Sequence, residues 1–263
     1  MKLDLSKIKF SNNDIRKNVQ IPDTLTPKLA EFIGIMVGDG HVGVYKNHSR
    51  KRTLSNFDIR ISGNLKDYNY YSEYVNNLTS ELFNLKFYVI IPKNENSLML
   101  YKNSKALYHL LSELMNIPPR KDNITIPEQI LNSSVEIKSW FLRGLADADF
   151  TFTLKNKEGR LYPVVQGVSK SENLIKGVSS ILKQLNINHF MCLDKSYYAK
   201  RNKTYVVTRL YINGFRNVSN WFDLIGFSNP RHTQRWKAFC DNKRAGRDSN
   251  TRQKSICSIT PSA

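Results

Sequence analysis

A repeat at a fixed spacing constrains this chain more than any other feature. Residues 29–40 (LAEFIGIMVGDG) and residues 139–150 (SWFLRGLADADF) share a pattern of apolar residues, a central glycine and a late acid. Two pairs align at the same offset of 110 residues, Gly34 with Gly144 and Asp39 with Asp149. A chain with two such copies is expected to fold as two similar units that pack together.

The same offset returns later in each copy. Residues 100–103 (LYKN) match residues 210–213 (LYIN), again at an offset of 110. Between these segments Ile61-Ser62 and Val168-Ser169 look equivalent at an offset of 107, which implies loops of different length around them. The repeat therefore extends well beyond the two motifs.

Each copy predicts the same order of elements after its motif helix. Two strands (42–45 and 57–62; 150–154 and 162–168) precede a helix (65–83; 171–185), two more strands (86–91 and 97–101; 190–193 and 205–211) and a closing helix (104–115; 215–224). The middle helix of the second copy has apolar residues at a spacing near 3.6. The order αββαββα predicts an α+β fold with two pseudo-symmetric halves, each containing a four-stranded antiparallel sheet.

The same pattern gives the domain boundaries. We assign residues 1–120 to the first half and residues 136–240 to the second half. Residues 121–135 form the linker, in a proline-containing stretch that begins at Pro118. Residues 241–263 form a basic tail that we expect to be flexible.

Small residues line one face of each motif helix. They lie four positions apart, as Gly34 and Gly38 in the first helix and as Gly144 and Ala148 in the second. Residues at positions i and i+4 share a helix face, and a face without large side chains lets two backbones approach closely. We therefore predict that the two motif helices pack side by side at the centre of the molecule.

The two repeated acids follow these small residues directly. If the helices pair, Asp39 and Asp149 lie close together at two helix C-termini, and both the mutual repulsion and the helix dipoles raise carboxylate pKa values. A hard divalent cation resolves that conflict, and Mg²⁺ suits carboxylate and phosphate oxygens. Bound metal can activate water and stabilise a leaving oxygen. We predict metal-assisted hydrolysis of one phosphodiester on each strand of DNA.

The net charge points to the same substrate. Forty Lys and Arg stand against twenty-two Asp and Glu, for a formal charge of +18, which favours a nucleic acid over an anionic membrane surface as partner. Basic residues gather in residues 41–60 and 195–209, and a two-stranded ribbon fits the DNA major groove. The candidate DNA contacts are Lys46, Arg50, Arg52, Arg60, Lys86, Lys93, Lys155, Arg160, Lys195, Tyr197, Lys200, Arg201 and Arg209.

Both motifs resemble the signature of the LAGLIDADG homing endonucleases. Residues 142–150 (LRGLADADF) match the nine-residue motif almost letter for letter. Residues 32–40 (FIGIMVGDG) keep its glycine at the third position and its acid at the eighth. The resemblance implies a single-chain, double-motif enzyme with a saddle of two sheets on DNA, and a cut that leaves short 3′ overhangs. It also implies metal ligation by Asp39 and Asp149 with the carbonyls of Gly38 and Ala148, and a basic residue near each scissile phosphate.

Several details of the site follow as expectations. Lys102 and Lys170 are the nearest matches to the two basic residues, although Ile212 replaces Lys102 in the second copy. Asp147 points away from Asp149 on a helix, so we assign it a hydrogen-bonding role. We expect two or more Mg²⁺ ions, with Mn²⁺ able to substitute and Ca²⁺ supporting binding without cleavage. Because the copies differ, the DNA target should be long and only partly palindromic.

Two other functions remain open on the same fold. One is an RNA maturase that assists intron splicing, and the other is a DNA-binding regulator without catalysis. Retention of both Asp39 and Asp149 favours cutting. Motifs of nucleotide-binding P-loops, zinc proteases and serine hydrolases are missing from the sequence.

The remaining features bear on the setting of the protein. Its first residues lack the apolar core of a secretory signal, and no run approaches the roughly 20 apolar residues of a membrane span. Three widely spaced cysteines do not indicate a disulfide framework. We therefore expect an intracellular, monomeric protein located with the host DNA, free-standing rather than part of an intein.

Overall fold

The computed structural model describes residues 1–48, 53–199 and 202–248. The first half contains a sheet in the order β1-β2-β4-β3, formed by β1 (Gly40–His48), β2 (Thr53–Asn64), β3 (Tyr88–Ile90) and β4 (Ser97–Asn103). The second contains a sheet in the order β5-β6-β8-β7, formed by β5 (Phe150–Lys157), β6 (Arg160–Ser169), β7 (Phe190–Tyr198) and β8 (Lys203–Asn213). All strand pairs are antiparallel, so the predicted fold class is confirmed.

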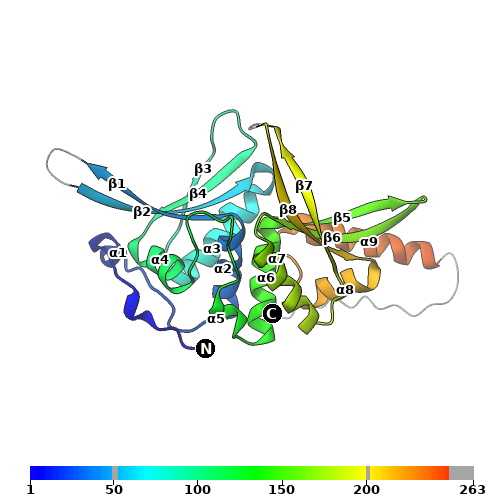
Figure 1. The fold of residues 1–263 in the computed structure, drawn as a ribbon, viewed down its shortest axis with the longest axis horizontal. Helices are drawn as coiled ribbons and strands as arrows, with labels where there is room; N and C mark the ends of the chain where they lie inside the picture. Colours follow the sequence, from blue (N-terminus) through cyan, green and yellow to red (C-terminus); the bar gives the residue numbers. More distant parts are fainter. Residues whose placement is uncertain (49–52, 200–201, 249–263) are drawn as a thin grey trace.

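The helices lie on one side of this pair of sheets (Figure 1). In the first half they are η1 (Leu5–Lys7), α1 (Asn12–Arg16), α2 (Pro27–Gly38), η2 (Leu65–Asp67), η3 (Tyr70–Val75), α3 (Asn76–Phe83), α4 (Lys105–His109) and η4 (Leu110–Leu114). The rest are α5 (Glu128–Leu131), α6 (Val135–Asp149), α7 (Glu172–Gln184), α8 (Phe215–Leu224) and α9 (Pro230–Asp248). The predicted helix over residues 65–83 is therefore divided into 3-10, π and α segments.

The motif helices α2 and α6 stand side by side at the centre of the molecule (Figure 1). Each begins with a side-chain cap, since Thr26 accepts from the amide of Leu29 and Ser134 from that of Ile137. Their contact face leaves no room for side chains. A Cβ on Gly34 would lie 2.1 Å from the Phe141 carbonyl oxygen, a contact closer than any real Cβ makes.

The other small residues of the motif helices lie in the same contact. A Cβ on Gly144 would lie 2.0 Å from the carbonyl oxygen of Glu31, and one on Gly38 would lie 2.4 Å from the Cβ of Ala148. All four residues predicted from the spacing are thus placed between α2 and α6. The helices meet backbone to backbone, which brings the ends of both motifs together.

The strand register corrects one detail of the repeat. Gly40 pairs with Ile61 in the first half and Phe150 with Gly167 in the second, so Ile61 corresponds to Gly167, at an offset of 106 rather than 107. The two pairs exchange a large and a small residue. A Cβ on Gly167 would lie 2.3 Å from the Phe150 ring, so Gly167 makes room for the phenylalanine that ends the second motif.

The C-terminal region contains more helix than the sequence predicted. Helix α9 extends to Asp248, so the tail expected to be flexible from residue 241 begins as helix, and residues 249–263 lie outside the described residues. On α9, Trp236 is 2% exposed and its ring stacks on Phe222 of α8, with centroids 4.7 Å apart. These aromatic contacts fix α9 to the second half. No helix among the described residues is long and apolar enough to cross a membrane.

Candidate active site

The two repeated acids end the central helices. Asp39 is the C-cap of α2, its amide donates to the carbonyl of Ile35, and its own carbonyl accepts from the amide of Ser62 on β2. Asp149 is the last residue of α6. The Oδ2 atom of Asp149 lies 3.4 Å from where a Cβ on Gly38 would be, and the charge of Asp149 acts on Asp39, so the two acids are neighbours. The structure therefore brings both acids to one place, between the two sheets.

Both carboxyl groups have raised pKa values. Burial and then the charge of Asp149 raise the pKa of Asp39 to about 7, although the Tyr71 hydroxyl and the Lys121 ammonium act in the other direction. Burial raises the pKa of Asp149 to about 6, against the opposing effect of Lys121. Such a pair, charged only at a free-energy cost, is a setting in which a divalent cation binds favourably.

Lys121 is a basic residue whose charge acts on both acids. Its Nζ atom donates to the carbonyl oxygens of Met36, at 2.9 Å, and Gly38, at 2.6 Å, at the end of α2. Burial lowers the pKa of Lys121 to about 8, while Asp149 and Asp39 act to raise it. The ammonium occupies a position lined by carbonyl and carboxylate oxygens, which is the environment that a cation requires.

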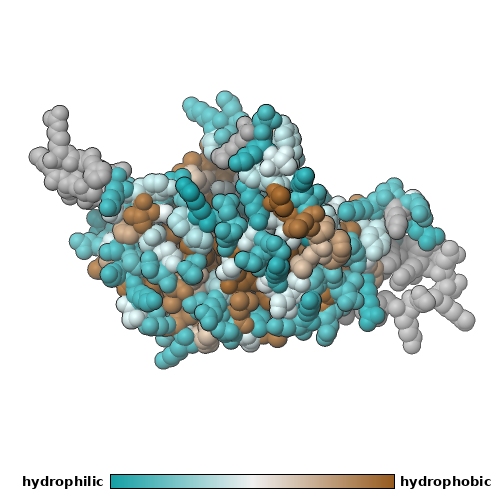
Figure 2. Space-filling view, in the orientation of Figure 1, coloured by the Kyte–Doolittle hydropathy of each residue, from teal (hydrophilic) through white to brown (hydrophobic). Residues whose placement is uncertain are grey.

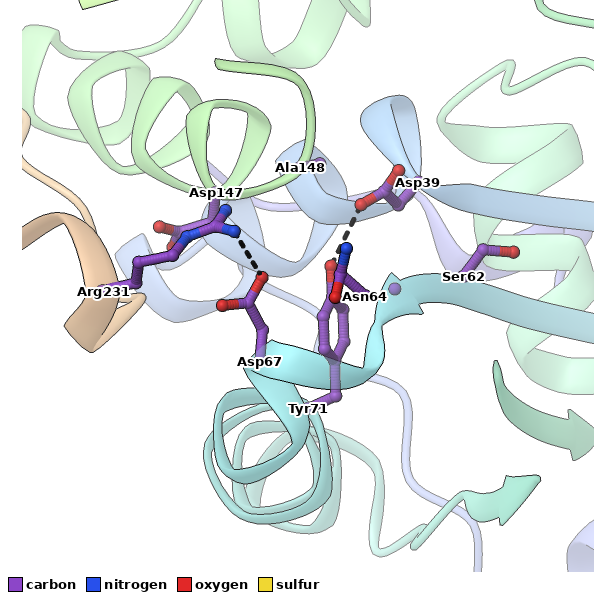
Figure 3. A pocket seen from close by; sticks show the side chains of 9 residues that line it. Asp39, Ser62, Asn64, Asp67, Tyr71, Asp147, Ala148 and Arg231 are labelled. Carbon is purple, nitrogen blue, oxygen red and sulfur yellow. Dashed lines mark hydrogen bonds and ion pairs between the residues drawn. The ribbon is translucent and has the colours of Figure 1, made fainter. Parts of the chain in front are cut away.

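Arg231 and Asp39 line the same pocket, of about 320 Å³ (Figure 3). Ser62, Tyr71, Asp147 and Ala148 also line this pocket. The Arg231 guanidinium pairs with Asp67 at 3.3 Å, while Asp67 is only 6% exposed. This pocket joins residues of both halves beside Asp39.

Lys121 and Arg231 are equivalent in the repeat, at the offset of 110 that relates the two acids. Five residues before each, Asn116 and Gly226 both adopt a positive φ, of 52° and 71°. Sequence reasoning missed the pair because Lys121 fell at the start of the predicted linker. The constant offset, followed across that boundary, would have found it.

The two lysines predicted beside the acids lie elsewhere. Lys102 shares the core face of β4 with Leu98 and Leu100, is 7% exposed, and donates from Nζ to the Lys86 carbonyl at 2.5 Å. Its repeat partner Ile212 is fully buried. The catalytic prediction for Lys102 is therefore wrong, because strand alternation turns it away from the exposed face of the sheet.

Lys170 follows β6 and is exposed. Its Nζ atom lies 3.8 Å from the centre of the Tyr205 ring on β8. No contact in the described chain joins Lys170 to Asp39 or Asp149, so the structure does not bring it into the site. The nearby cation is supplied by Lys121 instead.

Asp147 has the hydrogen-bonding role expected of it. It is 4% exposed and accepts from the backbone amides of Ser228 and Asn229, both at 3.0 Å, and from the Tyr70 hydroxyl at 3.1 Å. Burial raises its pKa to about 7. Asp147 thereby ties α6 to the segment before α9, and its counterpart Val37 is simply buried in the core.

Strand alternation separates the candidate DNA contacts into two groups. The face opposite the helices carries Arg60, Lys155, Arg160 and Arg209, and we call it the groove face. Arg60 forms an ion pair with Asp58, and Arg209 with Asp194 at 2.6 Å. Lys155 lies 5.1 Å from the Tyr211 ring centre. These four side chains are placed to meet a ligand lying across the sheets.

Other candidates are placed differently. Lys46 lies on the same face of its sheet as Val42. Lys195 and Tyr197 lie on the same face as Met191 and Leu210. In both sheets this is the face that packs on the helices closer to the core. Lys86 precedes β3, and Lys93 lies in the turn between β3 and β4; both are exposed. Outside the described residues are Arg50, Arg52, Lys200 and Arg201.

The oxygen atoms at the acids fit a hard divalent cation. In the described part of the chain no group of three or more His, Cys, Asp or Glu side chains could hold a metal. The available protein ligands are the carboxylates of Asp39 and Asp149 and neighbouring carbonyls, of which that of Gly38 already accepts from an ammonium. Two carboxylates supplemented by carbonyl, water and phosphate oxygens match the preference of Mg²⁺.

Comparison with known proteins agrees with this architecture. Residues 136–226 match the family model described as LAGLIDADG-like domain. The homing endonuclease I-DmoI in complex with DNA and Mn has a TM-score of 0.54 at 22% identity, over 77% of this chain and 98% of that one. The I-LtrWI LAGLIDADG homing endonuclease bound to target DNA has a TM-score of 0.54 at 10% identity, over 84% and 92%.

The chain thus has the double-motif fold of the LAGLIDADG homing endonucleases, and the resemblance predicted from its two motifs is confirmed. Among curated proteins, one component of the A-type ATP synthase of Pyrococcus abyssi (strain GE5 / Orsay) is 28% identical over 188 residues. That match covers 69% of this chain but only 16% of the relative. The chain therefore corresponds to a small part of that protein.

The raised pKa values predict a dependence of stability on pH. Between about pH 4 and pH 7 the folded metal-free protein retains protons that the unfolded chain releases, so its stability falls as pH rises through this window. For Asp39 alone the fall is at most about 4 kcal/mol. Divalent ions bind the ionised acids, so Ca²⁺ should raise the melting temperature more at pH 8 than at pH 6. Thermal unfolding with and without Ca²⁺ measures both effects, and an equal shift at both pH values would contradict them.

Proposed function

We propose that this protein is a site-specific DNA endonuclease that makes a metal-dependent double-strand break in a long, partly palindromic site. The observation that carries the proposal is the pairing of Asp39 and Asp149 at the ends of α2 and α6, between two basic sheets. One acid from each half of a pseudo-symmetric molecule suits two phosphodiesters on opposite strands.

The groove face supports DNA as the substrate. Three of its four residues, Arg60, Lys155 and Arg160, belong to β2, β5 and β6. These strands reach outward on both sides of the central helices (Figure 1), and hydrophilic residues predominate on the visible surface (Figure 2). The halves present different chemistry at equivalent positions, with Arg60 opposite Tyr101 and Gln166 opposite Tyr211. A target for such a surface is only partly palindromic.

The two acids are proposed as metal ligands from the geometry, and the two backbone carbonyls from the resemblance to the LAGLIDADG family. Asp39 and Asp149, with the carbonyls of Gly38 and Ala148, would hold Mg²⁺, and Mn²⁺ could replace it. The metal supplies Lewis-acid chemistry: a more acidic water and a stabilised leaving oxygen. Lys121, whose ammonium interacts with both acids, and Arg231, which lines the pocket beside Asp39, provide positive charge where negative charge builds up on phosphate.

One chain supplies both acids and both sheets, so we propose that it acts as a monomer. We also propose that it acts inside the cell, where its DNA substrate is. The test of the function is selection of cleaved sequences from a random double-stranded DNA library in the presence of Mg²⁺. Recovery of one long site with a cut on each strand supports the proposal, whereas the same recovery with Asp39→Asn would contradict the assigned site.

DNA binding should depend steeply on salt and on the groove face. Between 50 and 200 mM salt the affinity is expected to fall about 10³- to 10⁵-fold, as for proteins with six to ten phosphate contacts. Lys155→Gln should weaken binding and reduce the salt slope by about one. Lys195→Gln is the matched control, because Lys195 shares the face of Leu210. Equal effects of the two variants would contradict the assignment of the faces.

A further inference from the structure

Two neighbouring tyrosines of η3 reach the ends of the two central helices. The Tyr71 hydroxyl donates to Oδ2 of Asp39 at 3.1 Å, and the Tyr70 hydroxyl donates to Oδ2 of Asp147, also at 3.1 Å. Their rings are in edge contact, with centroids 5.0 Å apart and an interplanar angle of 76°. Both residues are 3% exposed, so the two hydroxyls are held in place by packing.

The contact of Tyr71 depends on a glycine in β2. A Cβ on Gly63 would lie 2.2 Å from the Tyr71 ring, so the ring reaches Asp39 only because position 63 has no side chain. Figure 3 shows Tyr71 rising from its helix toward Asp39, at the wall of the pocket that also contains Arg231. Two separate residues, Tyr71 and Gly63, thus combine to place one hydroxyl beside one acid.

The second half lacks this arrangement. Its corresponding helix, α7, has the sequence ENLIKGVSSILKQ, which contains no tyrosine. Among the described residues, no side chain donates a hydrogen bond to Asp149; only the charge of Lys121 opposes the effect of burial there. A carboxylate with a fixed donor has a defined orientation, while one without it must be oriented by the ligands themselves. The two acids are therefore held unequally.

We propose that Tyr71 is a positioning residue for Asp39 alone, so that its hydroxyl speeds the cut of one DNA strand relative to the other. This inference rests on the proposed endonuclease function. In it Tyr71 touches neither DNA nor metal; it fixes the rotamer of Asp39, which would bind the metal. The halves then differ in preorganisation, and removal of the hydroxyl makes the strand served by Asp39 the slower one.

The test compares Tyr71→Phe with Tyr70→Phe, a matched control that removes the neighbouring hydroxyl from an acid outside the metal ligands. The substrate is a site recovered from the library selection, with each strand labelled separately, and the rate of each cut is measured in Mg²⁺. Tyr71→Phe should slow one strand by about 10-fold, the effect of losing about 1.4 kcal/mol of a hydrogen bond to a charged group. Nicked DNA should accumulate, while Tyr70→Phe should leave the ratio of the two rates unchanged.

A second variant reaches the same bond without altering the tyrosine. Gly63→Ala should displace the ring and give the same unequal loss. A readout without DNA uses Ca²⁺ alone: the rise in melting temperature on adding Ca²⁺ should be smaller for Tyr71→Phe than for Tyr70→Phe.

The outcomes separate the inference from the function on which it rests. Equal slowing of both strands by Tyr71→Phe, or equal Ca²⁺ shifts for the two phenylalanine variants, overturns the role of Tyr71. If the wild-type protein cuts no DNA, the endonuclease proposal fails, and the Ca²⁺ comparison alone then decides whether Tyr71 positions Asp39.

Discussion

Asp39→Asn and Asp149→Asn are each expected to abolish double-strand cleavage and to leave Ca²⁺-supported DNA binding largely intact. The amide keeps the size of the side chain but removes the charge that holds a divalent cation between α2 and α6. We expect a loss of rate of about 10³-fold or more, the upper range for removing one electrostatic contribution to a transition state.

The control for this prediction is Asp223→Asn, which removes an exposed acid of α8. It changes the net charge by the same amount, and cleavage should continue at the wild-type rate. Gel assays on the selected target, with nicked and linear products resolved, measure the effect. If the variant with both Asp39→Asn and Asp149→Asn cut DNA at the wild-type rate, the mechanism of metal-dependent cleavage through these two carboxylates would be wrong.

Gly144→Ala is expected to destabilise the whole protein, because its methyl group would be forced against the Glu31 backbone at 2.0 Å. Neither helix can yield locally, since both run through the core. Overpacking of this kind typically costs about 1–3 kcal/mol or more, which exceeds the roughly 1 kcal/mol that alanine gains over glycine in a helix. The melting temperature should fall by about 2–4 °C for each kcal/mol.

Gly43→Ala is the matched substitution outside the helix contact. The nearest atom to its new Cβ would be Nε2 of His41, at 3.0 Å, which belongs to a side chain that can rotate. Thermal unfolding of the two variants compares them directly. If Gly144→Ala were as stable as Gly43→Ala, the close backbone contact of α2 and α6 would be wrong.

The pair of acids at the centre could be predicted because the motif that contains each acid occurs twice in the sequence. Asp39 and Asp149, and the glycines five residues before them, recur at one offset, and chance does not produce such agreement over both copies. The order of strands follows from the same repetition. Asp147 could be separated from Asp149 because two residues two apart on a helix point in different directions.

The remainder of the site depends on tertiary packing that a linear pattern does not contain. Lys102 was the nearest match to a basic residue that the resemblance implies, but strand register placed it among Leu98 and Leu100. Tyr71 belongs to no motif, and its contact with Asp39 depends on Gly63, which lies on a strand eight positions earlier. Charge and aromatic character were the basis for predicting DNA contacts by Lys46, Lys195 and Tyr197. The face of the sheet on which each side chain lies depends instead on its position in the alternation along the strand.

The exchange of large and small residues at the motif ends limits how such a molecule can be recombined. In one half glycine at position 40 faces isoleucine at 61, and in the other phenylalanine at 150 faces glycine at 167. A chimera that took a motif helix from one half and a second strand from the other would face either two bulky side chains in one space or a void. Breakpoints for exchanging segments between the halves must therefore lie outside the segment that runs from the motif helix to the end of the second strand. The residue that ends the motif and the residue opposite it on that strand then come from the same half.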